Sequence, residues 1–339
     1  MVEIDGSAGG GQILRTALTL SMLSSESVTV TDVRGDRSEP GLKPQHRTAV
    51  EVAAAVSDAT VEGAELGSEE VEFDPGTPTG GDYEAAIGTA GSLTLLFDTL
   101  LPLATVLDDP LSLSATGGTD VKWSPPMATY RRVKLPLLCE HGLAATVESE
   151  RPGFYPVGGG RATLRLWPST VSSLTLDGDP RNGDDIQVRI YSLAADSLAD
   201  GDVADRQADA VGQELTRLDL DVVHREVTYA AAASPGSSVV VELTDDGVLA
   251  GFDAYGEKGK RAEAVANDAV SDLDAFRETG AAVDEHLADQ LLVFLALAGG
   301  RIVVPRLTDH VETNLAVLDE FGYDLSVEES DRGVVVRGE

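Results

Sequence analysis

One pattern repeats along this chain and constrains its fold more than any other feature. An amphipathic helix is followed by a glycine or polar stop and then by two short strands. Copies are predicted at residues 44–73, 127–167, 309–337 and, more weakly, 205–243. Apolar residues recur at helical spacing, for example at Val311, Leu315 and Leu318. Because such helices and sheets must bury their faces against each other, we expect an α/β or α+β core of similar modules.

Two polar segments divide the chain. The turn-rich sequence DGDPRNGDD covers residues 177–185, and a second boundary is predicted near 274–282, before an apolar helix at 286–298. A length of 339 residues also suggests about two domains. We therefore predict a core domain formed by residues 1–183 and 279–339, with a small inserted α/β module at residues 184–278.

The acidic residues constrain the conditions and partners of this protein. The chain has 58 acidic and 25 basic residues, a net charge of −33. The acids are spread along the whole sequence, and only five basic residues are lysines. Self-repulsion weakens such a fold in dilute buffer, whereas molar salt shortens the screening length to about 3 Å. The composition is typical of salt-accumulating halophiles, and an ordinary acidic protein is the alternative.

Composition also excludes several classes of function. The net charge leaves no broad basic face, so any nucleic acid must be held by a small arginine pocket. Cys139 is the only cysteine, which excludes an internal disulfide and a cysteine-based zinc cluster. The apolar run 291–298 is too short to span a membrane, and the start has no basic and apolar export signal. We expect a cytoplasmic protein without membrane contact.

Two segments near the N-terminus are candidates for anion binding. The first is a glycine-rich strand-to-helix turn at residues 5–15, in which Arg15 lies in the first helical turn. It is neither a Walker A loop nor a GxGxxG fingerprint, and a plain tight turn is the alternative. The second is a loop stiffened by proline and glycine, for which a solvated loop is the alternative. Its candidate residues are Arg34, Arg37, Gln45 and His46.

Two helix starts near the C-terminus carry further candidates. The segment 286–290 opens the most apolar helix, and its Asp289 and Gln290 suit hydrogen bonds to a base or ribose. A first-turn acid also stabilises a helix without any ligand. Thr308 is a predicted N-cap, which places His310 in the first turn of the last helix. A lone histidine there is more often a surface residue than a nucleophile.

Taken in order, these segments resemble those of RNA 3′-terminal phosphate cyclases. The resemblance spans residues 4–318 and implies a core of three repeated βαβαββ units, with a smaller βααβ module inserted before the third. It rests on DGSAGGGQILRTAL, RxxRSEPGLKPQH, GGDY with AIGTAGSL, ATGGTDV, GFYPVGGG, HLADQLLVFLALAG and HVETNLAVL.

The resemblance implies an ATP-dependent enzyme of the ligase class that converts an RNA 3′-terminal phosphate to a 2′,3′-cyclic phosphate. His310, in a His-x-x-Thr-Asn segment, corresponds to the nucleophile that forms a covalent histidine–AMP intermediate before an RNA-adenylate. The co-substrate is ATP, with a divalent metal, Mg or Mn, and the partner is RNA rather than a stable protein complex. ATP-site residues carry over to His286, Leu287, Ala288, Asp289 and Gln290. The RNA-phosphate residues carry over to Arg15, Arg34, Arg37, Gln45 and His46.

Two departures and three alternatives accompany the resemblance. The family loop usually reads Gly-Glu-Gly-Gly-Gly, whereas this loop reads Ala8-Gly9-Gly10-Gly11 and lacks the acid tied to metal binding, so the metal ligands are unassigned. A family glutamine at the ATP site appears as Asp98. The alternatives are an inactive relative in ribosomal RNA processing, a protein that only binds RNA ends, and a nucleotide hydrolase. Inactive relatives lack the histidine, so His310 favours the enzyme.

Overall fold

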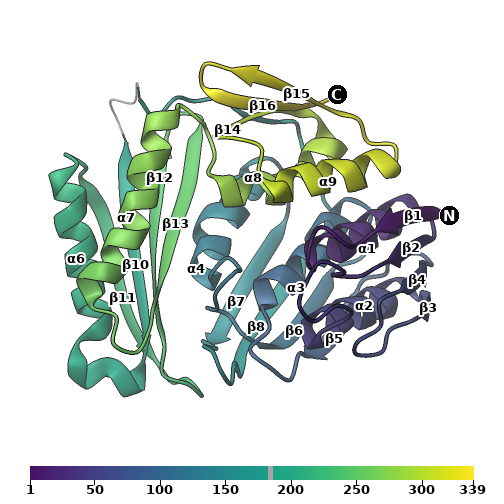
Figure 1. Cartoon of the computed structure of the whole chain (residues 1–339), viewed down its shortest axis with the longest axis horizontal. Helices are drawn as coiled ribbons and strands as arrows, with labels where there is room; N and C mark the ends of the chain where they lie inside the picture. Colours follow the sequence, from purple (N-terminus) through teal and green to yellow (C-terminus); the bar gives the residue numbers. More distant parts are fainter. Residues whose placement is uncertain (182–185) are drawn as a thin grey trace.

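Three copies of one βαβαββ unit form the body of the molecule (Figure 1). The computed structural model describes residues 1–181 and 186–339. The first unit comprises β1 (Val2–Asp5), α1 (Gln12–Ser24), β2 (Val28–Thr31), α2 (Pro44–Ser57), β3 (Thr60–Glu62) and β4 (Val71–Asp74).

The second and third units repeat this order. The second comprises β5 (Gly81–Ala86), α3 (Leu93–Leu100) with a 3-10 turn (Leu101–Thr105), β6 (Leu111–Gly117), α4 (Met127–Thr129), a π-helical turn (Tyr130–Lys134), α5 (Leu135–Glu140), β7 (Ala145–Arg151) and β8 (Gly160–Leu166). The third comprises β9 (Leu174–Leu176), α8 (Glu285–Ala298), β14 (Gly300–Val304), α9 (Asp309–Glu320), β15 (Leu325–Ser330) and β16 (Gly333–Gly338).

The three units build sheets of identical topology. Their strand orders are β1-β2-β4-β3, β5-β6-β8-β7 and β9-β14-β16-β15. In each sheet the first two strands are parallel and the other neighbours antiparallel. The α+β fold and the repeated unit predicted from the sequence are therefore confirmed.

A separate unit is inserted between β9 and α8. It comprises β10 (Gln187–Ala195), a 3-10 turn (Asp196–Gly201), α6 (Val203–Arg217), β11 (Val222–Ala230), β12 (Ser237–Asp245), β13 (Val248–Gly256) and α7 (Ala262–Thr279). This order is βαβββα and differs from the βααβ module that the resemblance implied. The weak copy at 205–243 is also not a repeat, because β11 and β12 both pair with β10 and not with each other. Alternation marks a strand but does not specify its neighbour.

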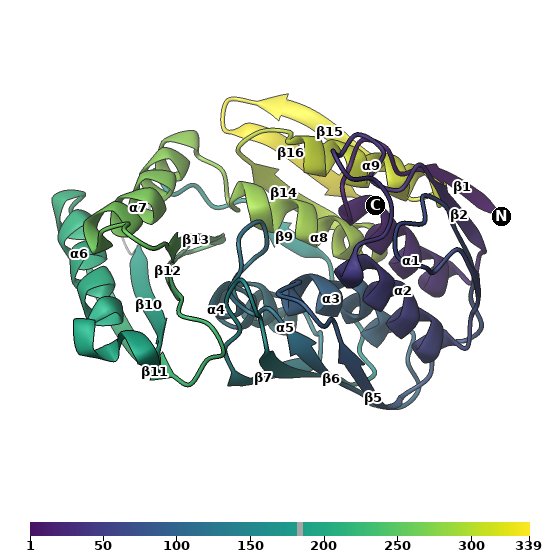
Figure 2. The same cartoon turned by 60° about the horizontal axis from the view of Figure 1, so that its bottom comes forward.

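Two buried clusters account for this arrangement. The helices of the three units lie between their sheets, where α1, α8 and α9 meet (Figures 1 and 2). The inserted unit has its own apolar core between its sheet and the helices α6 and α7. Each part thus has a buried cluster of its own, and the division into domains stays a prediction. The predicted boundary at 183/184 lies outside the described residues, and the boundary at 278/279 falls at the end of α7.

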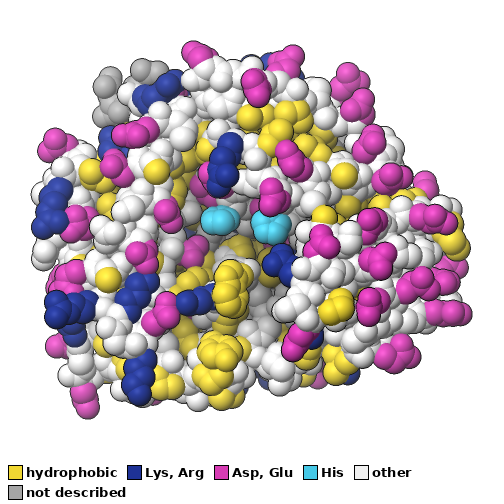
Figure 3. Space-filling view, in the orientation of Figure 1, with side chains coloured by type: hydrophobic (Ala, Val, Ile, Leu, Met, Phe, Trp, Pro, Cys, Tyr) yellow, Lys and Arg dark blue, Asp and Glu magenta, His cyan; other side chains and the backbone are white. Residues whose placement is uncertain are grey.

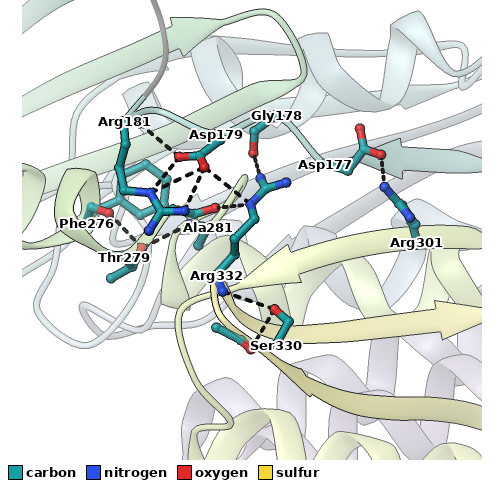
Figure 4. Close-up of polar contacts among 12 residues, drawn as sticks. Asp177, Gly178, Asp179, Arg181, Phe276, Thr279, Ala281, Arg301, Ser330 and Arg332 are labelled. Atoms are coloured by element: carbon teal, nitrogen blue, oxygen red, sulfur yellow. Dashed lines mark hydrogen bonds and ion pairs between the residues drawn. The ribbon is translucent and has the colours of Figure 1, made fainter.

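Both connections to the inserted unit are held by one arginine of the third unit. Nε of Arg332 donates to the carbonyl of Gly280 (3.0 Å), and its Nη2 donates to the carbonyl of Gly178. Asp179 lies 3.6 Å from Arg332 Nε and also binds Arg181 through both carboxylate oxygens (Figure 4). The chain therefore enters and leaves the insertion at one point, which we call the linker clasp (Gly178, Asp179, Gly280 and Arg332).

The inserted sheet approaches the second unit closely. A Cβ on Gly251 of β13 would lie 3.1 Å from Val133 and 3.2 Å from Thr129, in the segment formed by α4 and the π-helical turn. Gly251 N–H donates to the Asp284 carboxylate (3.0 Å), which also caps α8. Among the described residues, no helix has both the length and the apolar character needed to cross a membrane.

Candidate active site

The first part of the site is the glycine loop (residues 6–11), which connects β1 to α1. Gly10 adopts φ +54°, a conformation that favours glycine. A Cβ on Gly11 would lie 2.1 Å from Nε2 of His46 and 3.1 Å from Nη1 of Arg15. A Cβ on Gly10 would lie 3.1 Å from Nη2 of Arg37. The glycines therefore allow three cationic or hydrogen-bonding side chains from two segments to gather on one stretch of backbone.

Arg34 makes different contacts from Arg37 and His46, although all three are predicted to bind the RNA phosphate. Its Nη1 donates to the carbonyls of Glu39 (2.8 Å) and Gly41 (2.9 Å). Its backbone N–H donates to Gly6 O (3.0 Å), which ties the arginine loop to the glycine loop. The geometry shows Arg34 organising the loop that carries Arg37.

His46 lies buried beneath the glycine loop as a neutral imidazole. Burial, together with Arg15, Arg34 and Lys43, lowers the pKa of His46 to about 3. Its Nδ1 accepts a hydrogen bond from the Lys43 backbone N–H (3.2 Å). A neutral imidazole that accepts at Nδ1 carries its proton on Nε2, the atom that faces Gly11.

Gln45 connects this loop to the second unit. Its Oε1 accepts from the backbone N–H of Ser92 (2.7 Å) at the start of α3. A Cβ on Gly91 would lie 3.0 Å from Cβ of Gln45, so the two segments are in close contact. Gln45 therefore positions the loop that leads into α3.

The start of α8 presents part of the segment predicted to bind ATP. Leu287 and Ala288 are buried and anchor the helix, whereas His286 is exposed. Gln290 Nε2 donates to the His286 carbonyl (2.7 Å). Burial raises the pKa of Asp289 to about 7, because the carboxylate loses hydration. Asp289 is therefore partly protonated near neutral pH.

His310 lies at the start of α9. Thr308 is the N-cap, as predicted, and its hydroxyl accepts from Val311 N–H (3.2 Å). His310 is exposed in the first turn. Partial loss of hydration and the nearby Arg15, His286 and Arg37 lower the pKa of His310. In Figure 3, two histidine side chains (cyan) lie next to each other at the rim of a hollow, over the region where α8 and α9 begin.

Gln12 links the two helix starts, and the sequence analysis did not identify it as a site residue. Its Nε2 donates to Asp289 Oδ2 (2.9 Å) and to the carbonyl of His310 (3.1 Å). Asn314 forms a parallel link, because it accepts from Thr16 (2.8 Å) and donates to the Asp289 carbonyl (3.1 Å). Both residues lie within the quoted family segments, which was the only signal for them.

A buried ion pair supports the site and was also missed. Lys134 Nζ lies 2.6 Å from Asp98 Oδ1, and the two side chains are 3% and 17% exposed. The charge of Asp98 acts on Arg15, and the charges of Lys134 and Asp98 act on Asp289. Lys134 is one of only five lysines in the chain, and that scarcity was the available signal.

The structure thus brings most predicted residues together and gives two of them other contacts. Arg15, Arg37 and His46 gather at the glycine loop, and Gln12 joins Asp289 of α8 to the backbone of His310 in α9. Arg34 and Gln45 make contacts that hold the surrounding loops.

Comparison with known proteins agrees with this arrangement. The family model for RNA 3'-terminal phosphate cyclase matches residues 7–325. The chain belongs to the RNA 3′-terminal phosphate cyclase family.

Relatives with that name cover nearly the full chain. The protein from Halobacterium salinarum is 46% identical over 99% of both chains. The proteins from Pyrobaculum aerophilum and Pyrococcus furiosus are 40% and 39% identical, covering 94% and 95% of this chain and 92% and 93% of theirs. A solved enolpyruvyl transferase, NikO from Streptomyces tendae, matches with a TM-score of 0.27 and 14% identity over 49% of this chain and 33% of its own, too weak a likeness to bear on the fold.

In the residues 1–181 and 186–339, no three His, Cys, Asp or Glu side chains gather as a metal site. Residues 6–15 contain no acidic side chain, and Asp98 is paired with Lys134. These residues do not fit a metal site made by the protein alone.

Proposed function

We propose that this protein is an ATP-dependent RNA 3′-terminal phosphate cyclase in which His310 carries AMP. Membership of the cyclase family supports the overall reaction. The observation that carries the mechanism is an exposed His310 whose backbone carbonyl accepts from Gln12 (3.1 Å), the residue that follows the glycine loop. Partial loss of hydration and the charges of Arg15, His286 and Arg37 lower its pKa. A protein that only binds RNA ends has no need of such a nucleophile.

The first step is the attack of His310 on the α-phosphorus of ATP. A nitrogen lone pair of neutral imidazole forms the N–P bond, while the bond from phosphorus to the bridging oxygen breaks and pyrophosphate leaves. The lowered pKa of His310 keeps the ring neutral at neutral pH. Arg15 and Arg37 supply fixed positive charge for the negative charge that develops on the phosphate oxygens.

In this proposal the start of α8 binds ATP through His286, Leu287, Ala288, Asp289 and Gln290. The backbone N–H groups of His286 and Leu287 already donate to Asp284, and the buried Leu287 and Ala288 anchor the helix. The side chains that face the nucleotide are therefore those of His286, Asp289 and Gln290. With a pKa of about 7, Asp289 spends part of its time protonated. Partial protonation reduces its repulsion of a triphosphate and allows the carboxyl group to donate a hydrogen bond.

The next two steps use the RNA end. An oxygen of the 3′-phosphate attacks the phosphorus of the histidine–AMP, and the N–P bond breaks to restore His310. The neighbouring 2′-OH then attacks the activated 3′-phosphorus and AMP leaves, which closes the five-membered ring. Aligned intramolecular attack has an effective molarity of about 10⁵ to 10⁸ M, and it requires ribose at the reacting end.

The glycine loop and its neighbours hold the RNA phosphate. Arg15, Arg37 and the Nε2–H of His46 are the contact groups, while Arg34 and Gln45 position their loops. A divalent cation bound to the ATP phosphates would neutralise charge there.

The decisive experiment uses ATP labelled at the α-phosphate, in concentrated KCl with a divalent cation. We expect acid-labile, alkali-stable label on the wild-type chain and none on His310→Ala. His224→Ala, which removes an exposed histidine of the inserted unit, should label normally. Circular dichroism should show that His310→Ala remains folded. Normal formation of cyclic phosphate by His310→Ala would refute the assignment.

A further inference from the structure

The loop before α4 holds a tryptophan almost entirely in solvent. Trp123 is 95% exposed. Its φ of +63° is a conformation that bulky residues rarely adopt. Strain of this kind persists only where the surroundings enforce it, and it is concentrated at functional sites. An almost fully exposed indole on backbone with a positive φ therefore indicates a role other than stabilising the fold.

The backbone around Trp123 is fixed on both sides. Ser124 Oγ donates to Val121 O (2.9 Å), and Tyr255 Oη of β13 donates to Ser124 O (2.9 Å). Lys122 forms an ion pair with Glu257 (2.7 Å). The loop is thus tied to itself and to the inserted unit while the indole contacts little. Because the backbone that carries the indole is already ordered, a bound partner has to restrict only the side-chain rotation of Trp123.

A second exposed aromatic lies on the adjoining loop. Tyr155 is 76% exposed. The carbonyl of Gly153 accepts from the N–H groups of Thr119 (2.9 Å) and Asp120 (3.2 Å), which joins the Tyr155 loop to the Trp123 loop. Figure 3 shows hydrophobic side chains (yellow) gathered below the two histidines, at the mouth of the hollow.

These loops are continuous with the glycine loop that gathers Arg15, Arg37 and His46. Gly118 N–H donates to Gly91 O (2.7 Å), and Ser92 N–H donates to Oε1 of Gln45 (2.7 Å). Gln45 directly precedes His46, which faces Gly11. Two successive hydrogen-bonded contacts thus lead from the Trp123 loop to the segment proposed to hold the RNA phosphate.

We propose that Trp123, assisted by Tyr155, stacks on bases of the single-stranded RNA just upstream of its terminal phosphate. The inference rests on the proposed function for the location of that phosphate. Aromatic side chains bind unpaired bases by stacking, with little dependence on sequence. An indole this exposed suits a strand that continues into solvent better than an enclosed nucleotide.

The charge of the chain gives a physical reason for such a contact. A net charge of −33 repels RNA in dilute buffer, and molar salt screens both this repulsion and any attraction to arginine. Base stacking does not depend on counterion release. An aromatic platform therefore holds RNA under conditions in which phosphate contacts alone are weak.

The first test is steady-state cyclisation of a six-nucleotide single-stranded RNA with a 3′-phosphate, in 2 M KCl. Loss of one stacked base predicts that Trp123→Ala raises KM for this RNA by about 10-fold or more, with a smaller change in kcat. Trp123→Phe should recover much of the affinity, and Trp123→Leu should not. Trp167→Phe is the matched control and should leave KM unchanged.

The second test uses fluorescence, because Trp123 and Trp167 are the only tryptophans. In the Trp167→Phe variant, the six-nucleotide RNA should quench the remaining indole. Adenosine 3′-monophosphate, which lacks upstream bases, should quench it far less.

The outcomes separate this inference from the proposed function. Labelling of the protein by ATP needs no RNA. If the wild type is not labelled, the proposed function is refuted, whereas quenching of the indole by RNA still tests whether Trp123 stacks on bases. If Trp123→Ala labels and cyclises RNA with wild-type KM, the platform is refuted. A raised KM for ATP with an unchanged KM for RNA, or loss only of self-association, would also overturn it.

Discussion

His46 shows how surroundings set the state of a single side chain. Burial and three nearby cations lower its pKa to about 3, so it binds as a neutral donor rather than as a charge. Its Nδ1 is occupied by Lys43 N–H. The remaining Nε2–H faces the one position, Gly11, where the absence of a side chain leaves room for it.

Gly11→Ala tests this contact. Gly11 has φ −86°, which alanine adopts without strain, so the effect should come from the collision of the new methyl group with His46. Displacement of a binding group by about 1 Å costs up to about 10²-fold in rate, and we expect a fall of this order in kcat/KM for RNA. Gly212→Ala, in open space on α6, is the control and should be neutral or stabilising. Unchanged kcat/KM in Gly11→Ala would show that the contact is unimportant.

His310 should give a distinctive pH profile. Its folded pKa is lowered from 6.5, so the neutral, nucleophilic form persists below pH 6.5 and is lost only as the pH falls through the lowered value. Labelling by ATP should therefore stay above half-maximal at pH 6.5. Arg37→Gln removes one of the cations that lower this pKa, so the inflection should move to higher pH. Initial labelling rates across pH measure both, and an inflection above 6.5 in the wild type would contradict the expectation.

Secondary-structure elements bring the site together by their ends, and this sets the limit of prediction from sequence. The glycine turn, the Thr308 cap and the first-turn position of His310 follow from local patterns. The contacts of Gln12 and Asn314 do not, because their partners lie up to 298 residues away. The spacing of apolar residues does not predict which helix ends lie next to each other in the fold. Only the resemblance to the cyclase family predicted that these segments form one site.

The buried ion pair between Asp98 of α3 and Lys134 of the π-helical turn should stabilise the fold only while both charges are present. Lys134→Met leaves the Asp98 carboxylate without its cation, which typically costs about 3–5 kcal/mol of unfolding free energy. The double variant Asp98→Gln, Lys134→Met removes both charges and should recover much of that loss. Chemical denaturation in concentrated KCl measures both variants. Equal stabilities of the single variant and the wild type would show that the pair contributes little.

At the scale of the whole molecule, the net charge predicts a requirement for salt. We propose that carboxylate repulsion destabilises the fold in dilute buffer, so the melting temperature should fall on dilution out of concentrated KCl. Replacing the exposed Glu65, Glu69 and Glu70 by Gln should reduce this dependence. Sorbitol at equal osmolarity should protect less than KCl, because it does not screen charge. A melting temperature independent of salt would refute the proposal.

The repeated unit could be predicted from the sequence because each copy has its own local pattern. The inserted unit could not be predicted to the same degree. Its helix and two of its strands imitate the repeat at 205–243, but β10 pairs with both strands and changes the topology. The order of strands in a sheet depends on long-range pairing, which single-sequence patterns do not specify.

The linker clasp has a consequence for the order in which the chain folds. Parallel β9 and β14 are neighbours although the whole insertion separates them, and closing a disordered loop becomes slowly more costly with its length. Once the insertion is structured, the turn region between β12 and β13 holds both of its connections, because Gly178 N–H donates to Gly247 O (2.9 Å) and Leu249 N–H donates to Ala282 O (2.9 Å). That loop is then already closed before Arg332 of the third unit completes the clasp. We expect the insertion to nucleate first and the third unit to join later. During synthesis, a ribosome-bound chain would then acquire His310 in its final position only at the end.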